Sequence, residues 1–145
     1  MQKGYEFREH TADVEFVAKG PSIEAAFANA ILAMLDTVAD TAAIKKSKSK
    51  KSRIVIRDSA NNIEDLLWIV LQDVLSATDS RNVFGYGVEK LNIQNKKSTY
   101  GIYAVISAKQ QKPKYSYIYV KGVSRFGMEV KESPKAWLVK AVLDV

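Results

Sequence analysis

The amino-acid sequence predicts an α+β fold: a two-layer domain with two amphipathic helices packed on a mainly antiparallel sheet. Two segments carry apolar side chains at helical spacing, and the segments before, between and after them alternate in the manner of half-buried strands. The chain has 145 residues, the size of one domain around one core. We find no internal repeat and no linker, so residues 1–145 are expected to form a single domain.

The first part of the chain is expected to contain two strands and a helix. Residues 5–7 and 14–18 alternate between apolar and polar side chains, and residues 10–13 interrupt them. Ser22 is well placed as a helix N-cap. The helix after it is expected to be about 17 residues long. Its apolar stripe consists of Ile23, Ala26, Phe27, Ala30, Ile31, Met34, Leu35 and Val38.

The second helix follows a β-branched strand at residues 53–57. Asn62 and Asp65 have the spacing of a capping box at its start. The apolar residues then recur at the period of a helix, and they are Ile63, Leu66, Leu67, Val70, Leu71, Val74 and Leu75.

From Val83 onward the pattern favours strands. Gly85 and Gly87 lack a third glycine for a nucleotide-binding turn and indicate a turn or bulge instead. Residues 115–120 alternate with Tyr115, Tyr117 and Tyr119 on one face. We interpret that stripe as a strand surface packed on a helix, with base stacking as the alternative.

Composition excludes several functional classes. The chain has no cysteine, so it has neither disulfides nor a thiolate zinc site. It has no phosphate loop, and the common Ser-His or Cys-His nucleophile arrangements would have to use its one histidine, His10. We therefore expect no catalytic residue. With no apolar run of roughly 20 residues and no apolar leader at its start, a cytoplasmic protein without a membrane partner is expected.

The net charge of +6 is concentrated in two places. The lysine-rich segment, Lys45–Arg53, contains six basic residues, and a second basic group, Lys109, Lys112 and Lys114, surrounds Pro113. Clustered lysines attract phosphates, so tRNA is a candidate partner through these loops. Solvated surface loops explain the same pattern, and charge alone leaves both readings open.

Carboxylates at opposite ends of the chain suggest a cation site. Asp13 follows His10 at a break between two apolar segments, where it could bind a hard cation or cap a turn. Asp144 and Val145 end the chain directly after an apolar strand. If the first and last strands are neighbours, the two carboxylates could meet, and they would repel unless a cation or a basic group lay between them. Asp36 and Asp40 are interpreted as a solvated pair.

The chain resembles the archease family over nearly its whole length. The opening motif, which ends in His10-Thr11-Ala12-Asp13, and the terminal Leu143-Asp144-Val145 are the most specific matches. Further matches lie in both helices and in the later strands, at residues 23–30, 65–75, 120–123, 127–130 and 137–143.

The resemblance implies an α+β fold and a divalent-cation site at Asp13, Asp144 and the main chain or terminal carboxylate of Val145. Calcium is the first choice, with magnesium or manganese as alternatives. It also implies that the protein is not itself an enzyme but activates the RNA-splicing ligase RtcB, by promoting its GTP-dependent guanylylation and multiple turnover in tRNA splicing. A basic RNA-binding or chaperone-like module that modulates a tRNA-modifying enzyme is the alternative.

Two features depart from the family pattern. Many relatives have a histidine in the segment that corresponds to residues 124–127, and this chain has none. The loop at residues 109–114 is often acidic with histidine in the family, but here it is basic. Neither departure touches Asp13 or Asp144.

Overall fold

The computed structural model describes residues 4–8 and 13–145, so His10, Thr11 and Ala12 lie outside the described residues. In chain order the elements are β1 (Tyr5–Arg8), β2 (Asp13–Gly20), α1 (Ile23–Val38), α2 (Thr41–Lys46), β3 (Ser52–Ala60), α3 (Ile63–Ser80), β4 (Val83–Lys96), β5 (Thr99–Gln110), a 3-10 helix (Pro113–Tyr115), β6 (Gly122–Val123), β7 (Glu129–Glu132) and β8 (Trp137–Asp144).

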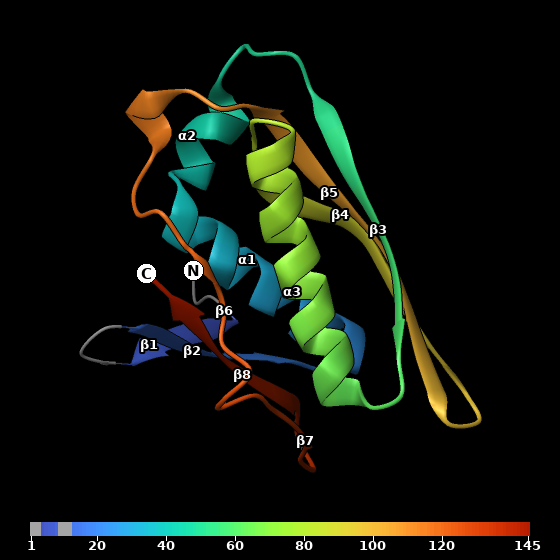
Figure 1. Ribbon diagram of the computed structural model, residues 1–145. Helices are drawn as coiled ribbons and strands as arrows, with labels where there is room; N and C mark the ends of the chain where they lie inside the picture. Colours follow the sequence, from blue (N-terminus) through green and yellow to red (C-terminus); the bar gives the residue numbers. More distant parts are fainter. Residues whose placement is uncertain (1–3, 9–12) are drawn as a thin grey trace.

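The fold is α+β, as predicted, but the described strands form two antiparallel sheets instead of one. One sheet has the order β1-β2-β8-β6 with β7 also paired to β8, and the other has the order β3-β5-β4. Helix α1 contacts β2 and β8 of the first sheet and β4 of the second, and α3 likewise contacts strands of both. The two long helices therefore join the sheets, and the three-stranded sheet runs along one side of α3 (Figure 1).

Both long helices begin at the N-cap residues that the sequence predicted, Ser22 and Asn62. The Ser22 hydroxyl accepts a hydrogen bond from the Ala25 amide at 3.1 Å, and the Asn62 side chain accepts one from the Asp65 amide at 2.8 Å. Asn62 also donates to the Asp65 carboxylate at 3.0 Å, which completes the capping interaction. The apolar stripes of the two helices supply nearly half of the buried side chains of the main core. Sequence periodicity was therefore sufficient to place both helices.

A third helix, α2, was not predicted. It has six residues, and Ile44 is its one buried side chain. A single buried position gives no helical stripe to detect. Its N-cap is Asp40, which accepts from the Ala43 amide at 3.1 Å, while Asp36 accepts hydrogen bonds from the hydroxyls of Tyr5 and Thr41. The interpretation of Asp36 and Asp40 as a solvated pair was therefore wrong.

The assignment of Lys109 to an exposed basic group was also wrong. Its side chain is 3% exposed, and its ammonium group donates to the carbonyl oxygens of Ile44, Lys45 and Ser47 at 2.9–3.2 Å. The last carbonyls of a helix lack partners within the helix, and a cation there is favourable. Lys109 thus caps α2, and Lys112 and Lys114 remain as the exposed members of the second basic group.

Residues 115–120 do not form the predicted strand. Tyr115 ends the 3-10 helix, and the chain then pairs with the end of α1 through hydrogen bonds from the Tyr117 amide to the Val38 carbonyl and from the Asp40 amide to the Tyr115 carbonyl. Tyr117 and Tyr119 are 60% and 67% exposed, so the tyrosine stripe is not a packed sheet surface. The bulge predicted at Gly85–Gly87 is present, as a register shift between β4 and β5.

Candidate functional site

The first candidate site residues, Asp13 and Asp144, lie directly opposite each other on neighbouring strands. β2 pairs antiparallel with β8, and Asp13 is the register partner of Asp144. Opposite residues in such a pair have Cα atoms about 4.5–5.5 Å apart and side chains on the same face. The condition set by the sequence, that strands from the two ends of the chain be neighbours, is therefore met.

Packing on the other face of this sheet fixes the positions of the two carboxylates. Phe16, Ala141 and Leu143 are fully buried. Because side chains alternate along a strand, Asp13 and Asp144 lie on the face away from that core. On its other side Asp144 pairs with Gly122 of β6, and its carbonyl accepts a hydrogen bond from the Lys121 amide at 2.7 Å. Gly122 has no side chain to cover the Asp144 carboxylate.

The donor chemistry at this position fits a hard divalent cation. Like charges directly opposite on a sheet repel, and no described basic side chain forms an ion pair with Asp13 or Asp144. Val145, half-buried, adds a main-chain oxygen next to them. Carboxylate and carbonyl oxygens are the ligands that calcium and magnesium take.

The described side chains would not complete such a site by themselves. Over residues 4–8 and 13–145, no three His, Cys, Asp or Glu side chains gather in a way that could hold a metal ion. Two aspartates with Val145 therefore leave coordination positions for water or for a partner's oxygen atoms. A site of this kind is open on one side.

An exposed loop borders the two aspartates. The Ser124 amide donates to the Val142 carbonyl at 2.9 Å, and a Cβ atom at Gly127, which has φ +81°, would lie 3.1 Å from the Val142 side chain. The loop is thus held against the residue two positions before Asp144. Phe126 at its tip is 86% exposed. The sequence had singled out this segment for its missing histidine only, although an aromatic residue before a glycine in a polar stretch could have marked it.

Helix α3 holds the base of this loop in place. The Trp68 indole donates to the Val123 carbonyl at 2.8 Å, and the Gln72 side chain accepts from the Val123 amide at 3.1 Å. The Arg125 guanidinium stacks 3.7 Å from the centre of the Trp68 ring. Trp68 is partly buried, and its indole nitrogen is satisfied by the hydrogen bond to Val123.

The profile of the Archease protein family matches residues 5–145, which include both aspartates and the bordering loop. The chain belongs to the archease family. Within the part of the chain that the structure describes, no helix is long and apolar enough to cross a membrane.

Relatives and solved structures agree with this membership. The chain is 30% identical to protein archease of Methanosarcina mazei, over 99% of this chain and 97% of the relative, and 29% identical to that of Aeropyrum pernix, over 98% and 97%. The solution structure of protein 1598 from Methanobacterium thermoautotrophicum superposes with a TM-score of 0.83 at 25% identity, over 99% of this chain and all of that one. A crystal structure from Thermotoga maritima, described as an archease and possible chaperone, has a TM-score of 0.59 at 16% identity, over 100% and 98%, and supports the fold alone.

Proposed function

We propose that this archease-family protein activates the RNA-splicing ligase RtcB in the cytoplasm, by promoting the ligase's GTP-dependent guanylylation and its multiple turnover in tRNA splicing. The observation that carries the proposal is the register pairing of Asp13 with Asp144, beside an exposed aromatic loop. The protein would act as a metal-binding accessory, and the covalent chemistry would belong to the ligase.

In this proposal the protein's own residues hold and present a cation. Asp13 and Asp144 supply carboxylate oxygens from two paired strands, and Val145 supplies a further oxygen. Calcium is the cation we favour, with magnesium or manganese as alternatives. When bound, the cation would supply positive charge that can neutralise charge on transferring phosphates.

The loop around Phe126 is the proposed contact with the ligase. A large apolar side chain that is almost fully exposed suits insertion into a partner's pocket, where a buried aromatic ring acts as an anchor. The stacking of Arg125 on Trp68 keeps the loop oriented before the partner arrives.

The test is guanylylation of the cognate ligase with GTP and calcium or magnesium, with substoichiometric amounts of this protein. We expect faster labelling over several turnovers, and loss of the stimulation with Asp144→Ala. Asp79→Ala, which removes an exposed carboxylate at the end of α3, serves as the matched control and should stimulate normally. Equal stimulation by the Asp144 and Asp79 variants would refute the role assigned to Asp144.

The second candidate is a basic RNA-binding or chaperone-like module acting on a tRNA-modifying enzyme. The lysine-rich segment favours it, because Lys45, Lys46, Lys48, Lys50 and Lys51 are all exposed. This function predicts salt-sensitive affinity for tRNA that survives loss of both Asp13 and Asp144. An Asp13→Ala variant separates the candidates, since it should abolish ligase stimulation while leaving tRNA affinity unchanged.

A further inference from the structure

No helix of the described residues covers the outer face of the three-stranded sheet. The buried side chains of β3 and β5, which include Ile54, Ile56 and Ile106, belong to the core that α1 and α3 cover. Alternate residues point to the other face, where Arg57 and Ser59 are exposed. In Figure 1 both long helices lie on one side of β3, β5 and β4, and the opposite side is bare. A hollow of about 770 Å³ lies on this bare face.

Six residues of the outer face line the hollow: Arg57, Ser59, Asn92, Gln94, Gly101 and Tyr103. The sheet register places Arg57 opposite Tyr103 and Tyr103 opposite Asn92, so these three form one row across the strands. Ser59, Gly101 and Gln94 form the next row in the same way. The lining is thus built by strands that meet only in the folded sheet.

Two cations flank the aromatic ring in this hollow. The Arg57 guanidinium lies 4.7 Å from the centre of the Tyr103 ring, and the Lys90 ammonium lies 5.9 Å from it. Both distances are those of cation–π contacts. None of the described carboxylates forms an ion pair with Arg57 or Lys90, so both charges are available to an anionic ligand.

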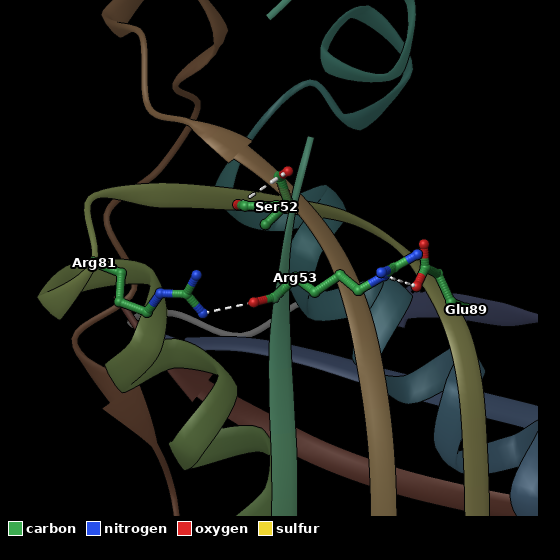
Figure 2. Close-up of polar contacts among 5 residues, drawn as sticks. Ser52, Arg53, Arg81 and Glu89 are labelled. Atoms are coloured by element: carbon green, nitrogen blue, oxygen red, sulfur yellow. Dashed lines mark hydrogen bonds and ion pairs between the residues drawn. The ribbon is translucent and has the colours of Figure 1, made fainter. Parts of the chain in front are cut away.

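The Glu89 carboxylate on this face is already occupied. Figure 2 shows the Arg53 guanidinium donating to Glu89 at 2.7 Å, while Arg81 of the α3 C-terminus donates to the Arg53 carbonyl at 2.7 Å. The hydrogen bond from Arg53 holds the pKa of Glu89 below its usual range. Glu89 therefore neutralises Arg53 rather than Lys90, and the face keeps its positive charge at the hollow.

Gly101 makes room for a flat ligand. A Cβ atom there would meet only the Asp58 carbonyl, at 4.0 Å, so nothing in the packing requires a glycine. Its missing side chain leaves the floor of the hollow open between the hydroxyl of Ser59 and the amide of Gln94. Hydroxyl and amide groups at such positions can form hydrogen bonds with the edges of a base.

We propose that this hollow binds single-stranded nucleic acid, with a base stacked on the Tyr103–Arg57 pair and phosphates held by Arg57 and Lys90. Single strands are recognised by stacking of bases on aromatic rings and guanidinium planes within a positive groove. An acidic peptide would satisfy the charges but would leave the flat floor and the stacking platform unused. The site is independent of Asp13 and Asp144 and goes beyond the proposed activation of a ligase.

The test is fluorescence anisotropy of the full-length protein with a labelled single-stranded RNA of about ten nucleotides, and with DNA of the same sequence, at low salt. Tyr103→Ala should weaken binding by about fivefold or more, and Tyr103→Phe should retain it, because stacking needs the ring and not the hydroxyl. Gly101→Val should weaken binding by filling the hollow, while Gly87→Val, where a Cβ meets no atom within 4 Å, should not. Thermal unfolding checks that each variant is folded.

Lys50→Gln in the lysine-rich segment controls for non-specific attraction, because it removes one exposed charge that does not line the hollow. Loss of affinity with Tyr103→Ala and Gly101→Val, but not with Gly87→Val or Lys50→Gln, supports the site, whether it is seen with the RNA or with the DNA. The oligonucleotide that binds more tightly shows whether the site prefers ribose or deoxyribose. The proposal is overturned if Tyr103→Ala binds like the wild type, if only Lys50→Gln loses affinity, or if polyglutamate competes as well as the oligonucleotide.

Discussion

At the scale of single residues, Asp58 is the most perturbed carboxyl group. One of its carboxylate oxygens is buried and accepts no hydrogen bond from any described group. Burial, together with the neighbouring Asp73 carboxylate of α3, raises the pKa of Asp58 to about 7. At neutral pH the Asp58 carboxyl is therefore partly protonated at the contact between β3 and α3.

This shift predicts a pH dependence of stability. The unfolded pKa is about 3.9, so between about pH 4 and pH 7 the native state binds more protons than the unfolded state and the free energy of unfolding falls as pH rises. Asp58→Asn should flatten this fall and make the protein more stable than the wild type at pH 8. Urea denaturation at pH 5 and pH 8 measures it, with Asp79→Asn as control. If the free energy of unfolding of Asp58→Asn differed between pH 5 and pH 8 as much as that of the wild type, the assignment of the shift to Asp58 would be contradicted.

Lys109 provides a second prediction at the same scale. Its ammonium group is the donor to three carbonyl oxygens at the end of α2, and its removal would leave those groups short of hydrogen bonds inside the protein. We expect Lys109→Met to lower the free energy of unfolding by about 1–3 kcal/mol. The exposed Lys112→Met should change it by less than about 0.5 kcal/mol. Equal stability of the two variants in urea would show that the cap contributes nothing.

At the scale of elements, α3 presents the Phe126 loop through its contacts with Val123. Phe126→Ala should raise the concentration needed for half-maximal ligase stimulation by about tenfold or more, since a buried aromatic anchor contributes about 2 kcal/mol. Cation affinity, measured by calorimetry, should not change. Phe7→Ala on β1 is the matched control, because Phe7 is also exposed, at 50%. A Phe126→Ala variant that stimulates like the wild type would place the ligase contact elsewhere.

The same scale shows which elements the sequence could predict. The starts and stripes of α1 and α3 depend on residues close in the chain, such as Asn62 with Asp65, and these were predicted correctly. Helix α2 depends instead on Lys109, 65 residues after Ile44, and no local pattern contains that contact. Residues 115–120 alternate like a strand, but their backbone partners are at the end of α1. Alternation predicts an extended chain and not its partner.

At the scale of the whole molecule, sites form where distant strands are in register. The pairing of Asp13 with Asp144 could be stated from the sequence only as a condition, because a slip of one residue would move them to opposite faces. The row of Arg57, Tyr103 and Asn92 was not predicted at all, since these residues come from three strands. The resemblance to the archease family predicted the candidate cation site, because the family's motifs include both Asp13 and Asp144. It supplied nothing for the outer face of β3-β5-β4.

If a cation binds at Asp13 and Asp144 as proposed, the pairing of β2 with β8 would couple its binding to the stability of the whole fold. Without a cation the two opposed carboxylates repel, so Asp13→Asn should stabilise the protein slightly, by up to about 1 kcal/mol, in a chelator. With calcium at about 100 times its dissociation constant, the wild type should gain about 2.7 kcal/mol and unfold several degrees higher. Asp13→Asn should gain much less, so the order of the two proteins should reverse when calcium replaces the chelator.

Calorimetric unfolding with chelator and with calcium measures the stability difference between the wild type and Asp13→Asn under both conditions. Asp79→Asn, which changes an exposed carboxylate far from β2 in the chain, should follow the wild type in both conditions. A calcium-induced rise of equal size in wild type and Asp13→Asn would place the cation away from Asp13. A reversal of the stability order requires that the Asp13 carboxylate destabilise the fold without the ion and stabilise it with the ion. An Asp13 carboxylate that does not bind the cation would not produce this reversal.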